Sequence, residues 1–256
     1  MAETVFNTTL KTPIQPPPPE VNWQEFVKVV ESRRSVRVYD GTPIPETVMR
    51  ECLRLALLAP NSSNLQPWEF YWVRSPEQKS RLVKACLSQP AARTASELIV
   101  CVARPGRWRE MQTLMLNAFE ASDTPPPPAA VHYYRKLVPF AYAQGPMGAF
   151  GLVKKLILSC MGLFRPTPRE PTSSHEMNEW AVKSTALACE NLMLAFRAAG
   201  FDSCPMEGMD SARVRRLLQL PCDARIVMVI SAGKRKAEGV YGPRFRFDEK
   251  LFLHEV

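Results

Sequence analysis

Three arginines and a serine lie within one short segment, at Arg33, Arg34, Ser35 and Arg37. Guanidinium groups carry paired N–H donors that match the oxygens of phosphate or carboxylate groups, so these side chains predict an anion clamp. The segment also falls where the amphipathic pattern that begins at Trp23 should end, and cations at the carboxyl end of a helix often complement the helix dipole on a solvated surface. From this segment alone, both interpretations remain open.

A run of small polar residues is followed at once by aromatic residues in the stretch APNSSNLQPWEF, from Ala59 to Phe70. Its hydroxyls and amides can both donate and accept hydrogen bonds, which suits a heterocycle with mixed edges, such as a flavin. A turn between a helix and a strand would have the same composition, because Asn and Ser are common turn residues. The polar side chains of this stretch are those of Asn61, Ser62, Ser63, Asn64 and Gln66.

The segment GFDSCPMEGMD, residues 200–210, is expected to be a loop that leaves a long helix. Pro205 and Gly208 would shape its backbone, and Glu207 lies between them. A loop of this kind can aim backbone N–H groups at a ligand. By itself the signal is weak.

Arginine and phenylalanine alternate in YGPRFRFDEK, residues 241–250. In an extended segment, alternate side chains share one face, so Arg244 and Arg246 would point the same way. They could meet a phosphate group together, or they could form the solvated face of a strand.

The elements that must position these residues follow from hydrophobic periodicity, capping boxes and proline stops. The irregular order of helices and strands favours an α+β layered domain over a doubly wound one. Helices are predicted from 23 to about 30, 45 to 59, 75 to 87, 108 to 119, 173 to 199 and from about 211, and strands over 69–74, 97–103 and 224–233.

Composition is that of a globular protein: of 256 residues, 46% are hydrophobic and 23% charged, enough to bury a sizeable core. The net charge of +8 favours anionic partners, but the basic residues are spread along the chain, and no nucleic-acid platform is expected.

Seven cysteines form no CxxC pair and no zinc-type spacing, so no metal site is expected and reduced thiols in the cytoplasm are favoured. Residues 1–22, which contain a run of four prolines, are expected to form an extended arm without the features of a signal peptide.

Taken in order, the four segments resemble the FMN-dependent nitroreductase family. Residues 33–37 match its RRSVR motif, and residues 59–68 match its APSSxNxQPW motif, with Asn61 where a Ser is usual. Residues 200–208 resemble its G-(x)4-P-x-E-G loop, and Arg244 with Arg246 resemble its C-terminal basic pair. The resemblance covers roughly residues 24–100 and 176–250.

The resemblance implies a three-layer α+β sandwich with a central, mainly antiparallel sheet, built from residues 23–256. It also implies a homodimer with FMN at the interface. The phosphate and ring edge would contact residues 33–37 and the C-terminal basic pair, and part of the flavin contacts would come from the partner subunit. The implied FMN contacts are Arg33, Arg34, Ser35, Arg37, Asn61, Ser62, Asn64, Gln66, Ser203, Pro205, Met206, Glu207, Gly208, Arg244 and Arg246.

The resemblance further implies an oxidoreductase in which NADH or NADPH reduces the flavin and the flavin reduces a small planar acceptor, such as a nitroaromatic or a quinone, in a ping-pong cycle. The backbone near Glu207 would face the reactive N5 atom, and no side chain is expected to act as a catalytic acid or base. The alternative is a protein that stores or senses FMN without turnover.

Residues 104–172 match the family poorly and are treated as an insert. Within it, residues 147–164 are apolar apart from two lysines and a serine, and the segment is too short to span a bilayer comfortably. A lid over the substrate is the favoured interpretation, and an interfacial helix at a membrane surface is the alternative.

Overall fold

An antiparallel sheet of four strands forms the centre of the protein, in a computed structural model that describes residues 17–256. The strand order is β1-β2-β4-β3, and every neighbouring pair is antiparallel. The strands are β1 (Trp68–Trp72), β2 (Glu97–Ala103), β3 (Asp202–Met206) and β4 (Arg225–Gly233). The predicted antiparallel sheet is confirmed.

The central strand β2 is buried on both faces because helices cover both sides of the sheet. Successive side chains of a strand point to opposite faces, and Leu98 and Val100 pack into one hydrophobic cluster while Ile99 and Cys101 pack into another. After Glu97, the strand sequence LIVCVA is therefore apolar throughout, without the alternation of a strand that has one wet face.

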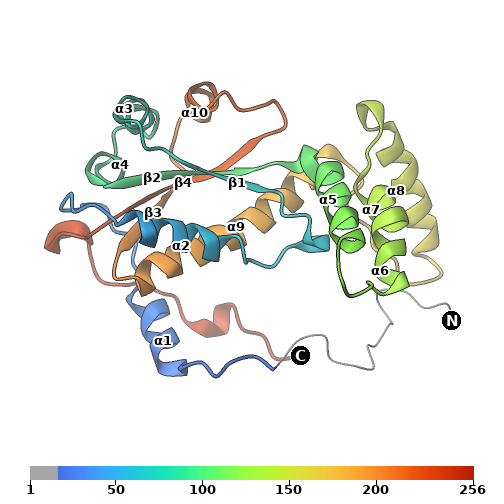
Figure 1. The fold of residues 1–256 in the computed structure, drawn as a ribbon, viewed down its shortest axis with the longest axis horizontal. Helices are drawn as coiled ribbons and strands as arrows, with labels where there is room; N and C mark the ends of the chain where they lie inside the picture. The colour runs from blue at the N-terminus through green and yellow to red at the C-terminus, as the bar shows by residue number, and fades with distance from the viewer. Residues whose placement is uncertain (1–16) are drawn as a thin grey trace.

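The two helical layers are shown in Figure 1. Helices α3 (Pro76–Ala85), α4 (Pro90–Thr94) and α10 (Ser211–Leu217) cover one face, and α2 (Glu46–Ala56) and α9 (Ser174–Ala198) cover the other. The predicted three-layer sandwich is confirmed. The serine of each predicted capping box, Ser75 and Ser173, does accept a hydrogen bond from the first turn of its helix.

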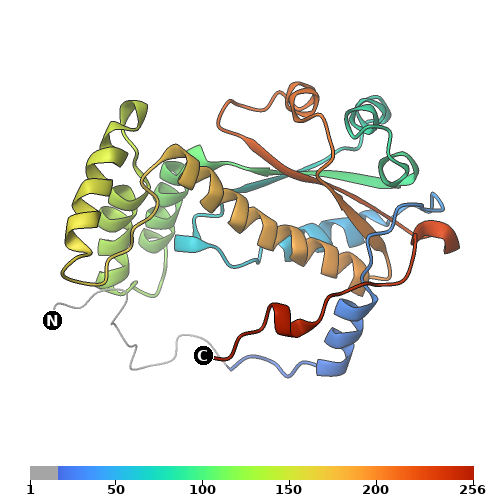
Figure 2. The ribbon, with the colours of Figure 1, turned by 180° about the vertical axis from the view of Figure 1, so that it is seen from behind.

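Helix α1 (Trp23–Ser32) and the C-terminal segment lie beyond α9, on the side away from the sheet (Figures 1 and 2). Of the predicted N-terminal arm, residues 17–22 form neither helix nor strand, and residues 1–16 lie outside the described residues.

Residues 104–172, the predicted insert, are largely helical and pack against the amino-terminal half of α9, at one end of the molecule (Figure 1). Its core contains Trp108, Tyr134 and Tyr142, which join Trp180 of α9 and Leu65 of the polar stretch. Its elements are α5 (Trp108–Glu120), α6 (Pro128–His132), a π-helical turn (Tyr133–Leu137), α7 (Val138–Tyr142) and α8 (Ala149–Met161). Short 3-10 turns occur at Ser62–Asn64, Pro105–Arg107, Pro146–Gly148, Ala237–Gly239 and Glu249–Leu251.

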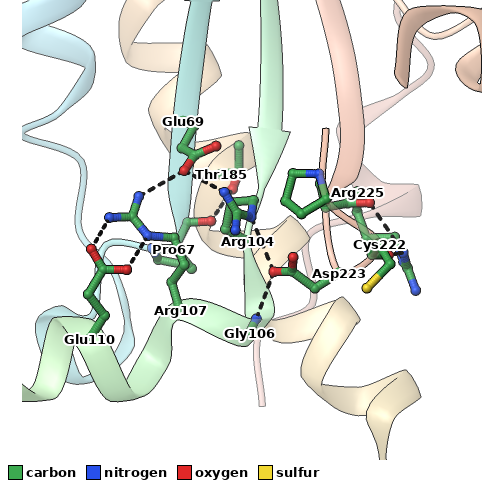
Figure 3. A network of polar contacts seen from close by, with 12 residues as sticks. Pro67, Glu69, Arg104, Gly106, Arg107, Glu110, Thr185, Cys222, Asp223 and Arg225 are labelled. Atoms are coloured by element: carbon green, nitrogen blue, oxygen red, sulfur yellow. Dashed lines mark hydrogen bonds and ion pairs between the residues drawn. The ribbon is translucent and has the colours of Figure 1, made fainter. Parts of the chain in front are cut away.

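A network of ion pairs anchors the start of the insert to the sheet (Figure 3). Glu69 of β1 accepts from Arg104 at 2.7 Å and from Arg107 at 2.8 Å. Arg104 also donates to Asp223 at 3.1 Å, and Arg107 pairs with Glu110 at 2.5 Å. All of these side chains except that of Glu110 are at most 29% exposed, so the network fixes the chain where it leaves β2.

The prediction that residues 200–210 form a loop is wrong for residues 202–206, which form β3. This strand pairs with β4 from Asp202 opposite Gly233 to Met206 opposite Val229. It lies at the edge of the sheet, where a residue without an N–H group such as Pro205 is tolerated.

Candidate functional site

A cavity of about 230 Å³ lies between the 33–37 segment and the 240–246 segment. Five arginines line it and no carboxylate does. Of the five, Arg33 alone lies within ion-pair distance of a carboxylate among the described residues, at 3.9 Å from Glu190. Cations clustered with so little neutralisation favour an anionic ligand, and guanidinium groups can bind phosphate oxygens in pairs. The predicted ligand residues that line the cavity are Arg33, Arg34, Ser35, Arg37, Arg244 and Arg246.

Hydrogen bonds between the two segments hold this cavity in shape. The Nη2 atom of Arg34 donates to the carbonyl oxygen of Gly242 at 2.6 Å, and the Nη2 atom of Arg244 donates to the carbonyl oxygen of Arg33 at 2.5 Å. The backbone N–H of Arg37 donates to the carbonyl oxygen of Gly239 at 2.7 Å. Two segments that are distant in the sequence thus form one basic site.

The edge strand β3 lies directly beside the arginine segment. Ser35 forms an isolated parallel bridge with Ser203, and the N–H of Val36 donates to the carbonyl oxygen of Ser203 at 3.1 Å. The hydroxyl of Ser203 is buried and has no hydrogen-bond partner among the described residues. An unpaired buried hydroxyl at this position can bond to a ligand that reaches it.

The remaining predicted residues of this region differ in their exposure. The side chain of Met206 is only 2% exposed and packs in the core beneath α3 and α10, so only its backbone can face a ligand. Pro205 is partly buried, Glu207 is exposed, and the carbonyl oxygen of Gly208 accepts from Gln89 at 2.7 Å.

A second and larger cavity, of about 1120 Å³, lies between the insert, α9 and the polar turn. Asn61 and Ser62 line it together with Tyr133, Tyr142 and Trp180. Aromatic rings and aliphatic side chains form most of its wall, which suits a flat apolar molecule better than an ion.

Tyrosines of the insert bind the hydroxyls of the polar turn. Ser63 Oγ lies 2.6 Å from the Tyr133 hydroxyl, and the Tyr142 hydroxyl lies 3.0 Å from both Ser62 Oγ and Ser63 Oγ. The Tyr134 hydroxyl donates to the Ser63 carbonyl oxygen at 2.8 Å. Burial raises the pKa of Tyr142, so its hydroxyl remains protonated at neutral pH. These contacts fix the turn from the insert side.

Asn61 shapes the same turn from within. Its Oδ1 atom accepts from the N–H of Gln66 at 2.7 Å, and its Nδ2 atom donates to the carbonyl oxygen of Ala59 at 3.3 Å. Ser63, Asn64 and Gln66 all have positive φ, a conformation that costs energy for residues other than glycine. The amides of Asn64 and Gln66 are exposed.

Within one chain, the predicted ligand residues do not converge on one cavity. The arginine cavity lies near Glu190 of α9, where Arg33 Nε approaches the carboxylate to 3.9 Å, whereas the second cavity is lined by Trp180, Ser184 and Leu187. From Ser184 to Glu190 the helix rises about 9 Å.

Comparison with known proteins identifies the family. The model of the nitroreductase family matches residues 30–234. The chain belongs to the nitroreductase family. A relative from Thermus thermophilus named "NADH dehydrogenase" is 30% identical to this protein over 207 residues, which cover 81% of this chain and 85% of that one.

Solved structures share the fold. The ydfN protein of Bacillus subtilis, named as a nitroreductase, superposes with a TM-score of 0.74 at 22% identity and covers 92% of this chain and 100% of its own. A protein of the same description from Exiguobacterium sibiricum, solved in complex with FMN, gives a TM-score of 0.62 at 23% identity over 90% of this chain and 97% of its own.

Two sets of residues at these cavities were not predicted from the sequence. Tyr241 and Gly242 line the arginine cavity, and their position directly before Arg244 was the available signal. Tyr133 and Tyr142 bind the polar turn from 70 to 80 residues away, and the sequence carries no local signal for such a contact. Among residues 17–256, no group of three or more His, Cys, Asp or Glu side chains could hold a metal ion.

Proposed function

We propose that this nitroreductase is an FMN-dependent oxidoreductase and that the arginine cavity holds the FMN phosphate. The observation that carries the proposal is the set of five arginines around one cavity without a carboxylate. Ser203, whose buried hydroxyl has no partner among the described residues, lies beside Ser35 of this cavity but does not line it. The Exiguobacterium protein with the same fold was solved in complex with FMN.

FMN, when bound, supplies the two-electron chemistry that side chains cannot perform. The residues of this chain bind and orient it: the arginines would neutralise the phosphate, and the end of β3 near Glu207 would lie along the ring. In our proposal, NADH or NADPH would transfer its hydride to the flavin, and the oxidised nicotinamide would leave before the acceptor binds in the same place, which is a ping-pong cycle. The name of the Thermus relative includes NADH.

The complete site is proposed to form between two copies of the chain. The polar turn at residues 61–66 lies apart from the arginine cavity of its own chain, so we place it at the flavin of the partner subunit. Large apolar side chains are exposed on α1 and on the C-terminal segment, including Trp23 at 65%, Phe26 at 52% and Phe252 at 66%. Exposed aromatic residues on adjacent segments are typical of an interface that a second copy covers.

The acceptor is proposed to enter the larger cavity, with the insert as its lid. A volume of about 1120 Å³ and largely apolar walls fit a planar nitroaromatic or quinone. The hydroxyls of Tyr133 and Tyr142 lie at the end formed by the polar turn, where they could bind a polar group of the acceptor.

The compartment is proposed to be the cytoplasm, since all seven cysteines are free and five of them are buried. No helix within residues 17–256 is long and apolar enough to cross a bilayer.

Anaerobic titration of the purified protein tests the function. After loading with FMN, addition of NADH or NADPH is expected to bleach the flavin absorbance within seconds, and a quinone is expected to restore it. If the protein binds FMN but neither donor bleaches it, the reductase is ruled out in favour of a storage or sensing protein. If the protein takes up no FMN, both functions are ruled out.

A further inference from the structure

Helix α8 of the insert buries only a narrow stripe of its surface. Gly151, Lys154 and Leu158, which are three and four residues apart and therefore on one face of the helix, are its buried residues. The side chains between them include Leu152, exposed at 70%, and Leu156, exposed at 72%. The apolar face of α8 thus points away from the protein.

The exposed apolar side chains continue past both ends of the helix. Met147 before it is fully exposed, and Leu163 and Phe164 after it are 79% and 89% exposed. Figures 1 and 2 both place α8 at the outer edge of the molecule, away from α1 and the C-terminal segment. We name this patch the α8 surface; it consists of Met147, Leu152, Val153, Leu156, Ile157, Leu163 and Phe164.

A buried lysine holds α8 in place beneath this surface. Lys154 is 1% exposed, and its Nζ atom donates to the carbonyl oxygens of Ala141 at 2.5 Å, Ala143 at 3.1 Å and Phe140 at 3.3 Å. These carbonyls lie at the end of α7, so the ammonium group ties the two helices together. The α8 surface is therefore presented on a fixed helix.

The segment that carries the α8 surface is basic along its sequence. The nearby carboxylates of Glu170, Glu176 and Glu179 line the cavity that Leu158 lines from the buried face of α8. Between Asp123 and Glu170 the sequence contains no Asp or Glu, whereas it contains several Lys and Arg residues. Among them, Lys155 and Arg165 are exposed beside the apolar side chains. Two copies of such a surface would repel one another, whereas an acidic lipid bilayer would attract it and accept its leucine and phenylalanine side chains.

We propose that the α8 surface docks this protein onto membranes that contain anionic lipid, with α8 lying flat in the interface. A helix of thirteen residues is about 20 Å long, which suits a position along the surface rather than across the bilayer. The basic residues draw the protein to the lipid headgroups, and Leu152, Leu156 and Phe164 insert among the acyl chains. The docking depends on neither the flavin nor its turnover.

Flotation with lipid vesicles tests the proposal on the full-length protein. Wild type is expected to float with vesicles of phosphatidylglycerol and phosphatidylcholine and to remain behind with phosphatidylcholine alone. Binding should weaken as the salt concentration rises, because screening reduces the attraction between exposed charges. Failure of the wild type to float with the anionic vesicles would overturn the proposal.

Substitutions test whether the vesicles bind the α8 surface in particular rather than exposed apolar side chains in general. A Leu152→Glu/Leu156→Glu variant is expected to lose flotation, and Lys155→Gln to lower vesicle binding roughly fivefold. The matched control is Leu87→Glu, because Leu87 is 68% exposed but follows α3. Since these side chains are exposed, the melting temperature should stay near that of wild type. Equal flotation of the double variant and the control would overturn the proposal. A lower native mass of the double variant than of the wild type in solution would also overturn it, because the α8 surface would then be a contact between copies of the chain.

Discussion

Replacement of Arg244 by methionine tests the phosphate site in the most direct way. Methionine retains an unbranched apolar stem but removes the guanidinium group, which lines the arginine cavity and donates to the carbonyl oxygen of Arg33 at 2.5 Å. If the cavity holds the FMN phosphate, the substitution removes one cation from the five that surround it. The affinity for FMN should then fall.

The size of the effect follows from the exposure of the side chain. A hydrogen bond to a charged group contributes about 1.5–3 kcal/mol, and because Arg244 is exposed to solvent, the lower end applies. A loss of about 1.4 kcal/mol corresponds to a dissociation constant roughly ten times higher. Arg33, with a side chain 21% exposed, should show a larger effect when it is replaced in the same way.

The assay compares FMN with riboflavin, which has the same ring and no phosphate. Flavin fluorescence quenching on the apoprotein gives both affinities. Arg244→Met should weaken FMN binding roughly tenfold while changing riboflavin binding by less than about threefold, the residual effect being the lost hydrogen bond between segments. The charge-matched control is Arg81→Met on the exposed side of α3, which should change neither affinity.

Two results would contradict the assignment of Arg244 to the phosphate site. Equal weakening of FMN and riboflavin would mean that Arg244 acts only by shaping the 240–246 segment. Unchanged FMN affinity would exclude this arginine from the phosphate site.

Three further predictions concern the residues around the sites. Tyr142→Phe removes a hydroxyl that binds both serines of the 62–64 turn, and it should lower the free energy of unfolding by about 1 kcal/mol in urea titrations; an unchanged value would mean that these contacts add nothing. Glu69→Gln leaves two partly buried guanidinium groups without their shared carboxylate, which should cost about 2 kcal/mol in the same measurement. Burial lowers the pKa of Lys154 to about 8 from 10.5. Between these pH values the unfolded chain binds more protons than the folded one, so the free energy of unfolding should rise with pH, by up to about 1.4 kcal/mol per pH unit relative to a Lys154→Met variant. Parallel pH profiles of the two proteins would contradict this pKa shift.

Much of the fold could be predicted from local patterns. The strand at 97–103 is a continuous apolar run after Glu97, and the long helix begins at the capping box of Ser173 and ends before Gly200. Strand β3 could not be predicted in this way, because its residues, DSCPM, have poor strand propensity. It is a strand only because its backbone pairs with β4, a contact that depends on the tertiary structure.

The residues of the candidate site could likewise be predicted only where local residue types indicate their role. The arginines of residues 33–37 could be proposed as anion ligands from their residue types, and the structure brings them together with Arg244 and Arg246. The tyrosines that bind the polar turn could not be found, because their role depends on how the insert folds back onto α9. The sequence around Tyr133 and Tyr142 therefore gives no indication that these residues contact the turn.

The hydrogen bonds that close the arginine cavity join segments far apart in the sequence, so the cavity is expected to form late in folding. Arg34 and Gly242 are 208 residues apart in the chain, and Arg244 and Arg33 are 211 apart. Contacts between distant segments carry a loop-closure cost and tend to form late, after local helices and hairpins. A ligand bound in the cavity would stabilise these late contacts. At a free concentration one hundred times its dissociation constant, it would raise the free energy of unfolding by about 2.7 kcal/mol.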